Sequence, residues 1–322
     1  MKLSDLGEFG LIERFSGRFL ENLQRGIVGI GDDAAVIPWD EGHSLLVTTD
    51  MLVEDTHFLR GAIAPRDLGF KSLAVNLSDI AAMGGMPLSF FLSLGLPPDI
   101  EVAWADGFFA GLHELAAVYG VGLLGGDTTK SLSAIVINIT ALGRAENRHI
   151  KLRSAAREGD VVCVTGTLGD SGAGLRLLLE NSPGGGDAEA LIARHNRPAP
   201  HVAEGHWLGA HDQVRAMMDV SDGIDSDLRR IIEKSNCGVD INLDKLPLSQ
   251  ELTRVGKLRG WDARELAATA GEDYCLLLTA AADKFPVLNK EFAARFGRSL
   301  HQIGTVTTKA GDLKYFDKGQ PA

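Results

Sequence analysis

The sequence predicts a mixed α/β protein of two domains. A chain of 322 residues is too long for one hydrophobic core of ordinary size. Segments rich in β-branched residues alternate with segments of helical periodicity, and a charged stretch at 144–160 separates the two halves. With 45% hydrophobic and 23% charged residues, the chain has the composition of a globular protein. The pattern does not specify the order of the strands in their sheets.

The first half begins with a predicted amphipathic helix. Apolar side chains recur at helical spacing after Ser4, and serine is a common N-cap residue. These apolar residues are Leu6, Phe9, Ile12 and Phe15. Two strands are predicted at 44–52 and 133–143, where β-branched residues are frequent.

Two further helices are predicted between these strands. Asp67 can cap a helix that runs to about Met83, and Asp99 can cap a second helix that ends at Tyr119. Glycine follows each of these segments, as is typical of helix C-termini.

A domain boundary is predicted at 144–160, where the apolar periodicity lapses and charges of both signs crowd together. The N-terminal domain is then 1–148 and the C-terminal domain 149–322. Beyond the boundary, a helix is predicted at 171–180 and an exposed turn at 181–187. Four strands are predicted at 160–166, 238–243, 274–280 and 300–306.

Charge and cysteine content narrow the function classes. The formal net charge of −11 argues against nucleic acid or an anionic membrane surface as the main partner, because both favour a basic face. No apolar run reaches about 18 residues, and the acidic N-terminus lacks a signal-peptide core. The three cysteines lack the spacing of a zinc site or a disulfide framework. These features predict a cytoplasmic protein.

Aspartates beside glycine, serine or threonine recur in five short segments, and one of them, Asp79, lies in an otherwise apolar helix. The segments are GIGDDAAV (29–36), TTDM (48–51), NLSD (76–79), GGDTT (125–129) and DVSDGIDSD (219–227). Each alone is typical of a turn or a helix cap. Four of the five lie at an edge of a predicted strand or helix, so their side chains can converge at one end of a sheet.

Converging carboxylates need a cation between them. Two unit charges about 4 Å apart repel by roughly 4 kcal/mol at an effective dielectric near 20. Oxygen ligands without paired histidines or cysteines suit Mg²⁺ better than zinc. An EF-hand is excluded, because Gly223 and Arg230 are the fifth and twelfth residues counted from Asp219. An irregular calcium site stays open.

Several Mg²⁺ sites indicate a polyphosphate substrate, since Mg²⁺ binds few protein carboxylates and takes phosphate oxygens as its other ligands. The sequence contains neither a Walker motif nor the protein-kinase loop set. The glycines of GGDTT and GIGDD are weak signals for phosphate-binding loops and gain weight only beside the aspartates.

Taken in order, the motifs resemble those of thiamine-monophosphate kinases. They are GEFGLIERF, GIGDDAAV, TTDMLVEDTHF, KSLAVNLSDIAAMGG, GGDTTK, VTGTLGDSGAGL, DVSDGIDSDL and AGEDY, and they span nearly the whole chain. That family belongs to the superfamily of aminoimidazole ribonucleotide synthetase, selenophosphate synthetase and the hydrogenase maturation dehydratase. The resemblance implies a homodimer in which the N-terminal sheets form a barrel, with a C-terminal α/β domain closing over the nucleotide.

The resemblance also implies roles for individual residues. The implied magnesium ligands are Asp33, Thr48, Thr49, Asp50, Asp79, Asp127, Asp219 and Asp222. The implied nucleotide contacts are Gly126, Asp127, Arg153 and Ser221. The implied contacts to thiamine phosphate are His57 and Glu272. Asp79 is then expected to project from the inward end of its helix to a metal cluster, while its aliphatic neighbours pack in the core.

Some acidic residues have alternative roles. Asp32 could replace Asp33 as the ligand, because sequence cannot separate two adjacent carboxylates. Asp225 and Asp227 could cap the helix that begins near Ile224.

Three other site residues have purely structural alternatives. Alone, His57 is typical of a hydrogen-bonded structural histidine, and Arg153 is typical of a solvated charge. Glu272 could cap the strand-like segment that follows it.

The implied reaction moves the γ-phosphoryl of ATP onto thiamine monophosphate, with Mg²⁺ as the cofactor, and gives thiamine diphosphate and ADP. A phosphate monoester has a second pKa near 6, so the acceptor is largely ionised at pH 7 and neither a general base nor a covalent intermediate is expected. One alternative is another ATP-dependent reaction of the superfamily, as in the ribonucleotide or selenophosphate synthetases. A second alternative is a non-enzymatic module that binds divalent ions.

The sequence departs from the family at one point. Family members commonly carry a C-terminal Gly-Trp or Gly-Tyr followed by Asp-His-Phe, whose aromatic residue covers the pyrimidine of the substrate. This sequence ends in DKGQPA without that motif. Which group covers the pyrimidine therefore stays open.

Overall fold

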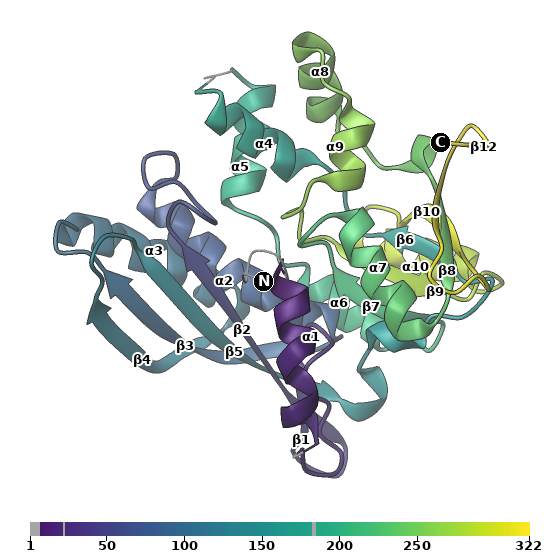
Figure 1. The fold of residues 1–322 in the computed structure, drawn as a ribbon, viewed down its shortest axis with the longest axis horizontal. Coiled ribbons are helices and arrows are strands. Elements are labelled where there is room, and N and C mark those ends of the chain that lie inside the picture. The colour runs from purple at the N-terminus through teal and green to yellow at the C-terminus, as the bar shows by residue number, and fades with distance from the viewer. Residues whose placement is uncertain (1–6, 22, 182–184) are drawn as a thin grey trace.

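Two β-sheets with helices packed around them make up the computed structural model (Figure 1). It describes residues 7–21, 23–181 and 185–322. The first sheet belongs to the N-terminal half of the chain and the second to the C-terminal half. Two 3-10 turns, Asn147–His149 and Arg153–Ala155, lie between them in the chain. The predicted mixed α/β class is confirmed.

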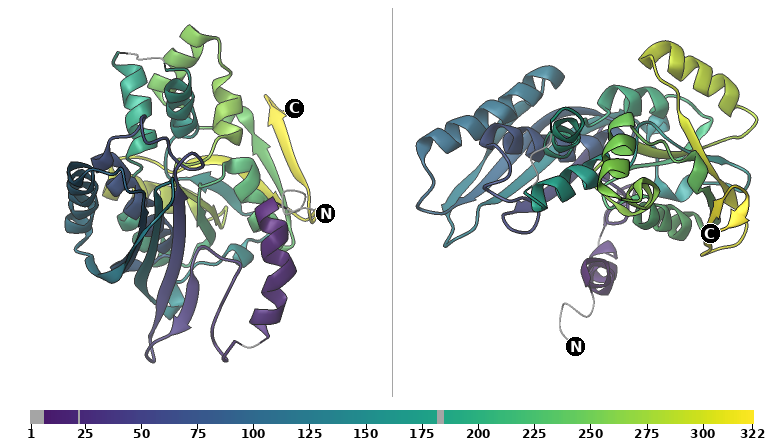
Figure 2. Two further views of the ribbon diagram at one scale, coloured as in Figure 1. Left: turned by 60° about the vertical axis from the view of Figure 1, so that its left-hand side comes forward. Right: turned by 90° about the horizontal axis from the view of Figure 1, so that it is seen from above.

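The first sheet has five strands in the order β1-β2-β5-β3-β4, and every pairing is antiparallel except that of β3 with β4. The elements of this half are α1 Gly7–Leu20, β1 Ala35–Pro38, β2 His43–Val53, α2 Pro65–Ala82, β3 Met86–Leu96, α3 Val102–Tyr119, β4 Gly122–Lys130 and β5 Val136–Glu146. Helix α1 projects from the rest of the molecule in the right-hand view of Figure 2.

One face of the first sheet is covered and the other is open. Along β2, Thr48 is buried whereas Met51 is 54% exposed, as expected when alternate side chains point to opposite faces. Helix α2 packs on the covered face and is itself covered by α3. Glycines allow this close packing, since a Cβ atom on Gly69 would lie 1.9 Å from the carbonyl oxygen of Phe108. Because α2 is buried between the sheet and α3, most of its side chains have to be apolar.

The second sheet has seven strands in the order β12-β11-β8-β10-β6-β9-β7. Two of its inner strands, β6 and β9, are buried along their whole length, as in a sheet covered on both faces. The strands of this half are β6 Val161–Val164, β7 Val214–Asp219, β8 Gly238–Asn242, β9 Leu276–Ala280, β10 His301–Thr307, β11 Leu313–Asp317 and β12 Gln320–Pro321. The helices are α4 Asp170–Leu179, α5 Asp187–Asn196, α6 Val202–Gly209, α7 Ile224–Ser235, α8 Gln250–Arg259, α9 Ala263–Thr269 and α10 Phe285–Phe296, with a 3-10 turn at Leu243–Lys245.

The predicted helices and strands are present, with differences at their ends. Strand β5 begins three residues later than the predicted 133–143 segment. The proposed cap Ser4 lies outside the described residues, and so does part of the predicted turn at 181–187.

Both predicted aspartate caps are wrong. Helix α2 begins earlier, at Pro65, because proline suits the first helical turn; Asp67 lies inside that turn and pairs with Arg197. Helix α3 begins after Glu101, and Asp99 pairs with Arg60 instead. The predicted glycine end of α3 is confirmed by Gly120, whose φ is +65°.

In the part of the chain that the structure describes, no helix has the length and apolar character needed to cross a lipid bilayer.

Candidate active site

Three carboxylates from distant parts of the chain meet between the two sheets. Asp33 precedes β1, Asp79 lies on α2, and Asp219 is the last residue of β7. One oxygen from each lies within 4.8 Å of those of the other two. We call these three residues the acidic cluster. Asp219 is separated from Asp33 and Asp79 by more than 100 residues of sequence, yet all three contribute to one site, as the motif pattern predicts.

Asp79 is the carboxylate in the middle of an apolar helix. Its neighbours on α2, including Leu77 and Ile80, are buried in the core, while its own side chain reaches the acidic cluster. The hydroxyl of Thr48 on β2 donates a hydrogen bond to Asp79 Oδ2. Burial raises the pKa of Asp79 well above its ordinary value, and the nearby charges of other aspartates raise it further. An ionised Asp79 side chain is therefore costly unless a cation lies close to it, and the hydrogen bond from Thr48 orients its carboxylate.

Asp219 has the same kind of environment. Its side chain is fully buried at the end of β7, and Ser78 Oγ donates a hydrogen bond of 2.6 Å to its Oδ2. Burial raises the pKa of Asp219 to about 7, and the charge of Asp33 adds to the effect. Because Ser78 and Asp79 are adjacent on α2, one helix turn orients two members of the acidic cluster.

Asp33 is paired with a cation. The Arg153 guanidinium donates to both Asp33 oxygens, at 2.7 Å and 3.3 Å. Burial nevertheless raises the pKa of Asp33, although Arg153 opposes this. The neighbouring Asp32 points elsewhere and accepts a hydrogen bond of 2.7 Å from the backbone N–H of Arg153. Geometry therefore favours Asp33 over Asp32 as the inward-facing carboxylate, and Arg153 is not a solvated charge.

The TTD segment of β2 is divided between the two faces of its sheet. Asp50 is on the same face as Thr48, and its charge raises the pKa of both Asp79 and Asp219. The hydroxyl of Thr49 lies on the open face, where Thr140 donates to it at 3.1 Å. Of the predicted ligands on β2, Thr48 and Asp50 thus face the acidic cluster and Thr49 faces away.

Asp227 is a further buried acid near the acidic cluster. It is 1% exposed on the first turn of α7, and its Oδ2 has no hydrogen-bond partner in the described residues. Burial raises the pKa of Asp227 to about 9, and the charges of Asp219 and Asp222 contribute. Asp225 and Asp227 lie in the first turn of α7, where a negative charge is favourable, as predicted, but the N-cap residue itself is Gly223. Sequence reasoning missed this acid because an aspartate in a first helical turn looks like a favourable charge at the helix N-terminus.

Asp222 itself is exposed in the loop before α7, and its charge raises the pKa of the nearby Asp227. In this loop, the backbone carbonyl of Ser221 accepts a hydrogen bond of 2.8 Å from the N–H of Glu272. This hydrogen bond directly joins Ser221, a predicted nucleotide contact, to Glu272, a predicted substrate contact.

Gly126 and Asp127 are not brought to the acidic cluster within one chain. They lie on β4, an exposed strand at the edge of the first sheet. The strand register places Gly126 in one row with Asp50, three strands away, which is roughly 14 Å at the usual strand spacing. Their roles stay predictions.

His57 and Glu272 line one pocket. Its volume is about 500 Å³, and it lies between the loop after β2 and the N-terminal part of α4. The wall also contains Ser171, His195 and several leucines. His57 Nδ1 accepts a hydrogen bond of 3.0 Å from the backbone N–H of Val53, so its Nε2 remains available to a ligand. We call this cavity the Glu272 pocket.

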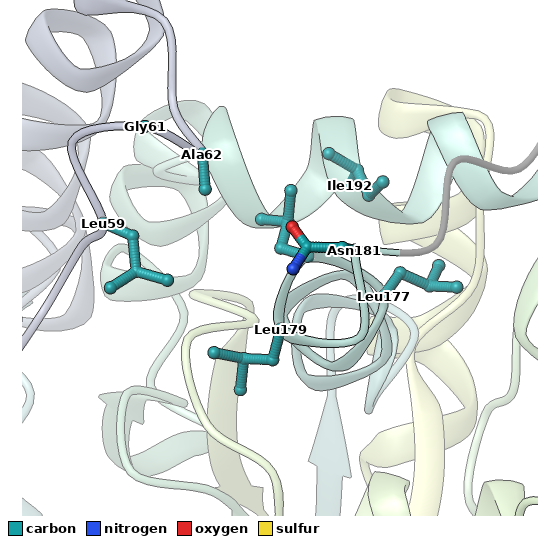
Figure 3. Close-up of a pocket in the computed structure, with 8 residues that line it drawn as sticks. Leu59, Gly61, Ala62, Leu177, Leu179, Asn181 and Ile192 are labelled. Atoms are coloured by element: carbon teal, nitrogen blue, oxygen red, sulfur yellow. The ribbon is translucent and has the colours of Figure 1, made fainter.

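A larger cavity of about 610 Å³ lies beside it and is shown in Figure 3. The side chains in its wall are apolar apart from Asn181, and they come from α4, α5 and the loop at Leu59. Leu59 and Leu179 line both cavities. Among the described residues, the wall of the larger cavity carries no charge that could bind a phosphate, so the Glu272 pocket is the better candidate for a phosphorylated ligand.

Comparison with known proteins identifies the family. Residues 31–145 match the model of the AIR synthase related protein N-terminal domain, and residues 157–315 match that of the C-terminal domain. The thiamine-monophosphate kinase of Bacillus subtilis (strain 168) is 38% identical over 292 residues, covering 90% of this chain and 88% of the relative. That of Escherichia coli (strain K12) is 38% identical over 324 residues, covering 98% and 95%. The chain belongs to the thiamine-monophosphate kinase family.

The fold of this thiamine-monophosphate kinase family member is similar to that of a solved structure, AaThiL complexed with AMPPCP and TMP. The TM-score is 0.88 at 35% identity, and the match covers 100% of this chain and 96% of the other. The family resemblance drawn from the motifs is therefore confirmed.

The acidic cluster of this family member fits a hard divalent cation. Its oxygens come from carboxylates whose pKa values burial has raised, and Asp227 adds a buried oxygen that has no hydrogen-bond partner among the residues the structure describes. Such a set of oxygens is typical of Mg²⁺ or Ca²⁺ sites rather than of zinc sites.

Proposed function

We propose that the protein transfers the γ-phosphoryl group of ATP to thiamine monophosphate. The observation that carries this proposal is the acidic cluster beside a pocket lined by His57 and Glu272. The relatives are thiamine-monophosphate kinases, and the similar structure AaThiL was solved with AMPPCP and TMP. The acidic cluster would hold Mg²⁺, and the pocket would hold the acceptor.

The residues of the site would act by positioning. When bound, Mg²⁺ supplies positive charge that screens two polyanions from each other and stabilises charge on the transferring group. Asp33, Asp79 and Asp219 would bind it, while Thr48 and Ser78 hold two of these carboxylates in place. The acceptor phosphate is already ionised at neutral pH, so no side chain needs to remove a proton.

The remaining predicted residues complete this proposal. Asp50 and Asp222 would join the metal site. Thr49, whose hydroxyl lies on the opposite face of β2, and Asp127, on the distant strand β4, would not reach the acidic cluster of the same chain with their side chains. Gly126, Arg153 and Ser221 would contact the nucleotide. Arg153 would then exchange its contact with Asp33 for one with phosphate.

We also propose a homodimer, formed through the open face and the β4 edge of the first sheet. The unpaired edge of β4 and exposed apolar residues such as Met51 and Phe91 support this. Light scattering should give twice the mass of one chain; a monomer at micromolar concentration would contradict the dimer. The division at residue 148 and a cytoplasmic location stay predictions.

Release of ADP in the presence of Mg²⁺ and ATP tests the function. Thiamine monophosphate should support ADP formation with thiamine diphosphate as the product, whereas free thiamine should not, because it lacks the ionised acceptor oxygen. Excess chelator should abolish the reaction. Turnover with an amide or carbonyl acceptor and not with thiamine monophosphate would favour the synthetase branch, and ion binding without ATP turnover would favour a non-enzymatic module.

A further inference from the structure

A buried lysine connects α2 to the wall of the Glu272 pocket. The Lys71 side chain is 1% exposed, and its Nζ donates to Glu272 Oε2 at 3.1 Å. Nζ also lies 3.5 Å from His195 Nε2. Lys71 lies on α2, about two helical turns before Asp79, whereas Glu272 and His195 belong to the C-terminal half. The contact therefore joins the two halves of the chain beside the pocket.

The imidazole of His195, which lies next to the Lys71 ammonium, is uncharged. Burial lowers the pKa of His195 to about 3, and the charge of Lys71 contributes, so the imidazole is uncharged at pH 7. Because an ammonium group only donates, Nε2 of His195 must accept and Nδ1 carries the ring proton. Nδ1 lies 2.9 Å from Ser171 Oγ and 3.3 Å from Glu272 Oε2. Lys71 is thus the charged partner of Glu272, and His195 fills the space beside them.

The backbone of Glu272 is held separately. Its φ is +63°, in the left-handed region that non-glycine residues rarely adopt, and its N–H donates to the Ser221 carbonyl. The preceding Gly271 packs so closely that a Cβ atom would lie 2.3 Å from the same carbonyl oxygen. The backbone contacts thus fix the position of the Glu272 Cα atom, and the contact with Lys71 fixes the position of its carboxylate.

The chemistry of the pocket indicates what this carboxylate recognises. The Glu272 side chain is 26% exposed and lines the pocket, whose wall also includes Leu175 and Leu266. A carboxylate beside apolar walls is complementary to a cationic aromatic ring, which thiamine phosphate carries in its thiazolium group. A partly buried carboxylate without such a partner would instead turn toward solvent.

We propose that Lys71 is a positioning residue for substrate recognition. Its ammonium holds the Glu272 carboxylate directed into the pocket, so that it can receive the cationic ring of the acceptor. This inference rests on the proposed function. It assigns a role to a buried lysine that the motif comparison leaves without one.

A double-mutant cycle on the Michaelis constant for thiamine monophosphate tests this role. Lys71→Met removes the ammonium and keeps an unbranched side chain in the buried space. We expect the KM for thiamine monophosphate, and its calorimetric Kd, to rise about tenfold, with the KM for ATP changed less than about twofold. In a Glu272→Gln background, Lys71→Met should change neither constant by more than about twofold, because Lys71 acts through Glu272.

Stability gives a second readout if Lys71→Met alone folds poorly. Glu272→Gln should lower the melting temperature, since it leaves a buried ammonium without its carboxylate, and adding Lys71→Met should restore it. Lys151→Met is the matched control, because Lys151 is 6% exposed and donates to the carbonyls of His211 and Val214 away from the pocket. It should change stability without changing the KM for thiamine monophosphate.

The outcomes separate the two proposals. A wild-type protein that does not turn over thiamine monophosphate would contradict the proposed function. A wild-type protein that does, together with an unchanged KM in Lys71→Met or with additive effects in the double variant, would show that Lys71 does not position Glu272.

Discussion

Asp79→Asn is expected to lower kcat on the order of 10³-fold while the protein stays folded. Asparagine has nearly the same shape and keeps an oxygen that can accept from Thr48. It removes, however, a negative charge from the acidic cluster, and with it much of the affinity for Mg²⁺. Because burial has raised the pKa of Asp79, the metal-free variant should melt at the same temperature as the wild type or higher.

The control for this variant is Asp106→Asn. Asp106 is an exposed aspartate on α3, outside the acidic cluster, and its replacement changes the net charge of the protein by the same amount. It should leave kcat unchanged. Near-normal turnover in Asp79→Asn would show that Asp79 is not an essential ligand.

The metal-free protein is expected to lose stability as the pH rises from about 4 to 7. Between the ordinary value of 3.8 and about 7, folded Asp219 holds a proton that the unfolded chain has lost. Stability is therefore greatest below this window and falls as the pH passes through it. One pKa unit corresponds to about 1.4 kcal/mol, so Asp219 alone accounts for a few kcal/mol. Asp227, with its pKa of about 9, extends the decline to higher pH.

Mg²⁺ should reverse most of this decline, because it binds the ionised carboxylates. Melting temperatures measured in chelator and in about 10 mM Mg²⁺ should differ little at pH 5 and most at pH 8. Asp273, whose pKa burial also raises to about 7, accepts from the amides of Gly169 and Ser171 and should leave a residual slope that Mg²⁺ does not remove. An equal effect of Mg²⁺ at both pH values would contradict a metal site made of these acids.

Much of the site was predictable because it places charged side chains in segments that are otherwise apolar. A carboxylate such as Asp79 in an apolar helix has no structural reason to be there, so the conflict itself indicates a ligand. Asp33, just before β1, and Asp219, at the end of β7, are likewise carboxylates next to apolar segments, which also indicates a ligand. The family motifs implied that His57 and Glu272 both contact thiamine phosphate, which stays a prediction; the structure places both residues in the wall of one pocket.

The rest depends on packing that the sequence does not show. Asp227 is indistinguishable from a favourable first-turn acid until the burial of α7 is known. Strand β4 contains two adjacent glycines, Gly125 and Gly126, and lacks the β-branched pattern of a buried strand. Lys71 is unremarkable in sequence, because only the tertiary structure brings α2 against α5 and the loop that carries Glu272.

The central claim is that distant carboxylates gather to hold divalent cations between two anionic reactants. Crystals grown with Mn²⁺, a non-hydrolysable ATP analogue and thiamine monophosphate test it directly, because Mn²⁺ shares oxygen ligands with Mg²⁺ and can be located by its anomalous scattering. The strongest anomalous peaks should lie between Asp33, Asp79 and Asp219, with the nucleotide phosphates as further ligands. Mn²⁺ bound elsewhere, with these three carboxylates free of metal in the ternary complex, would contradict the account.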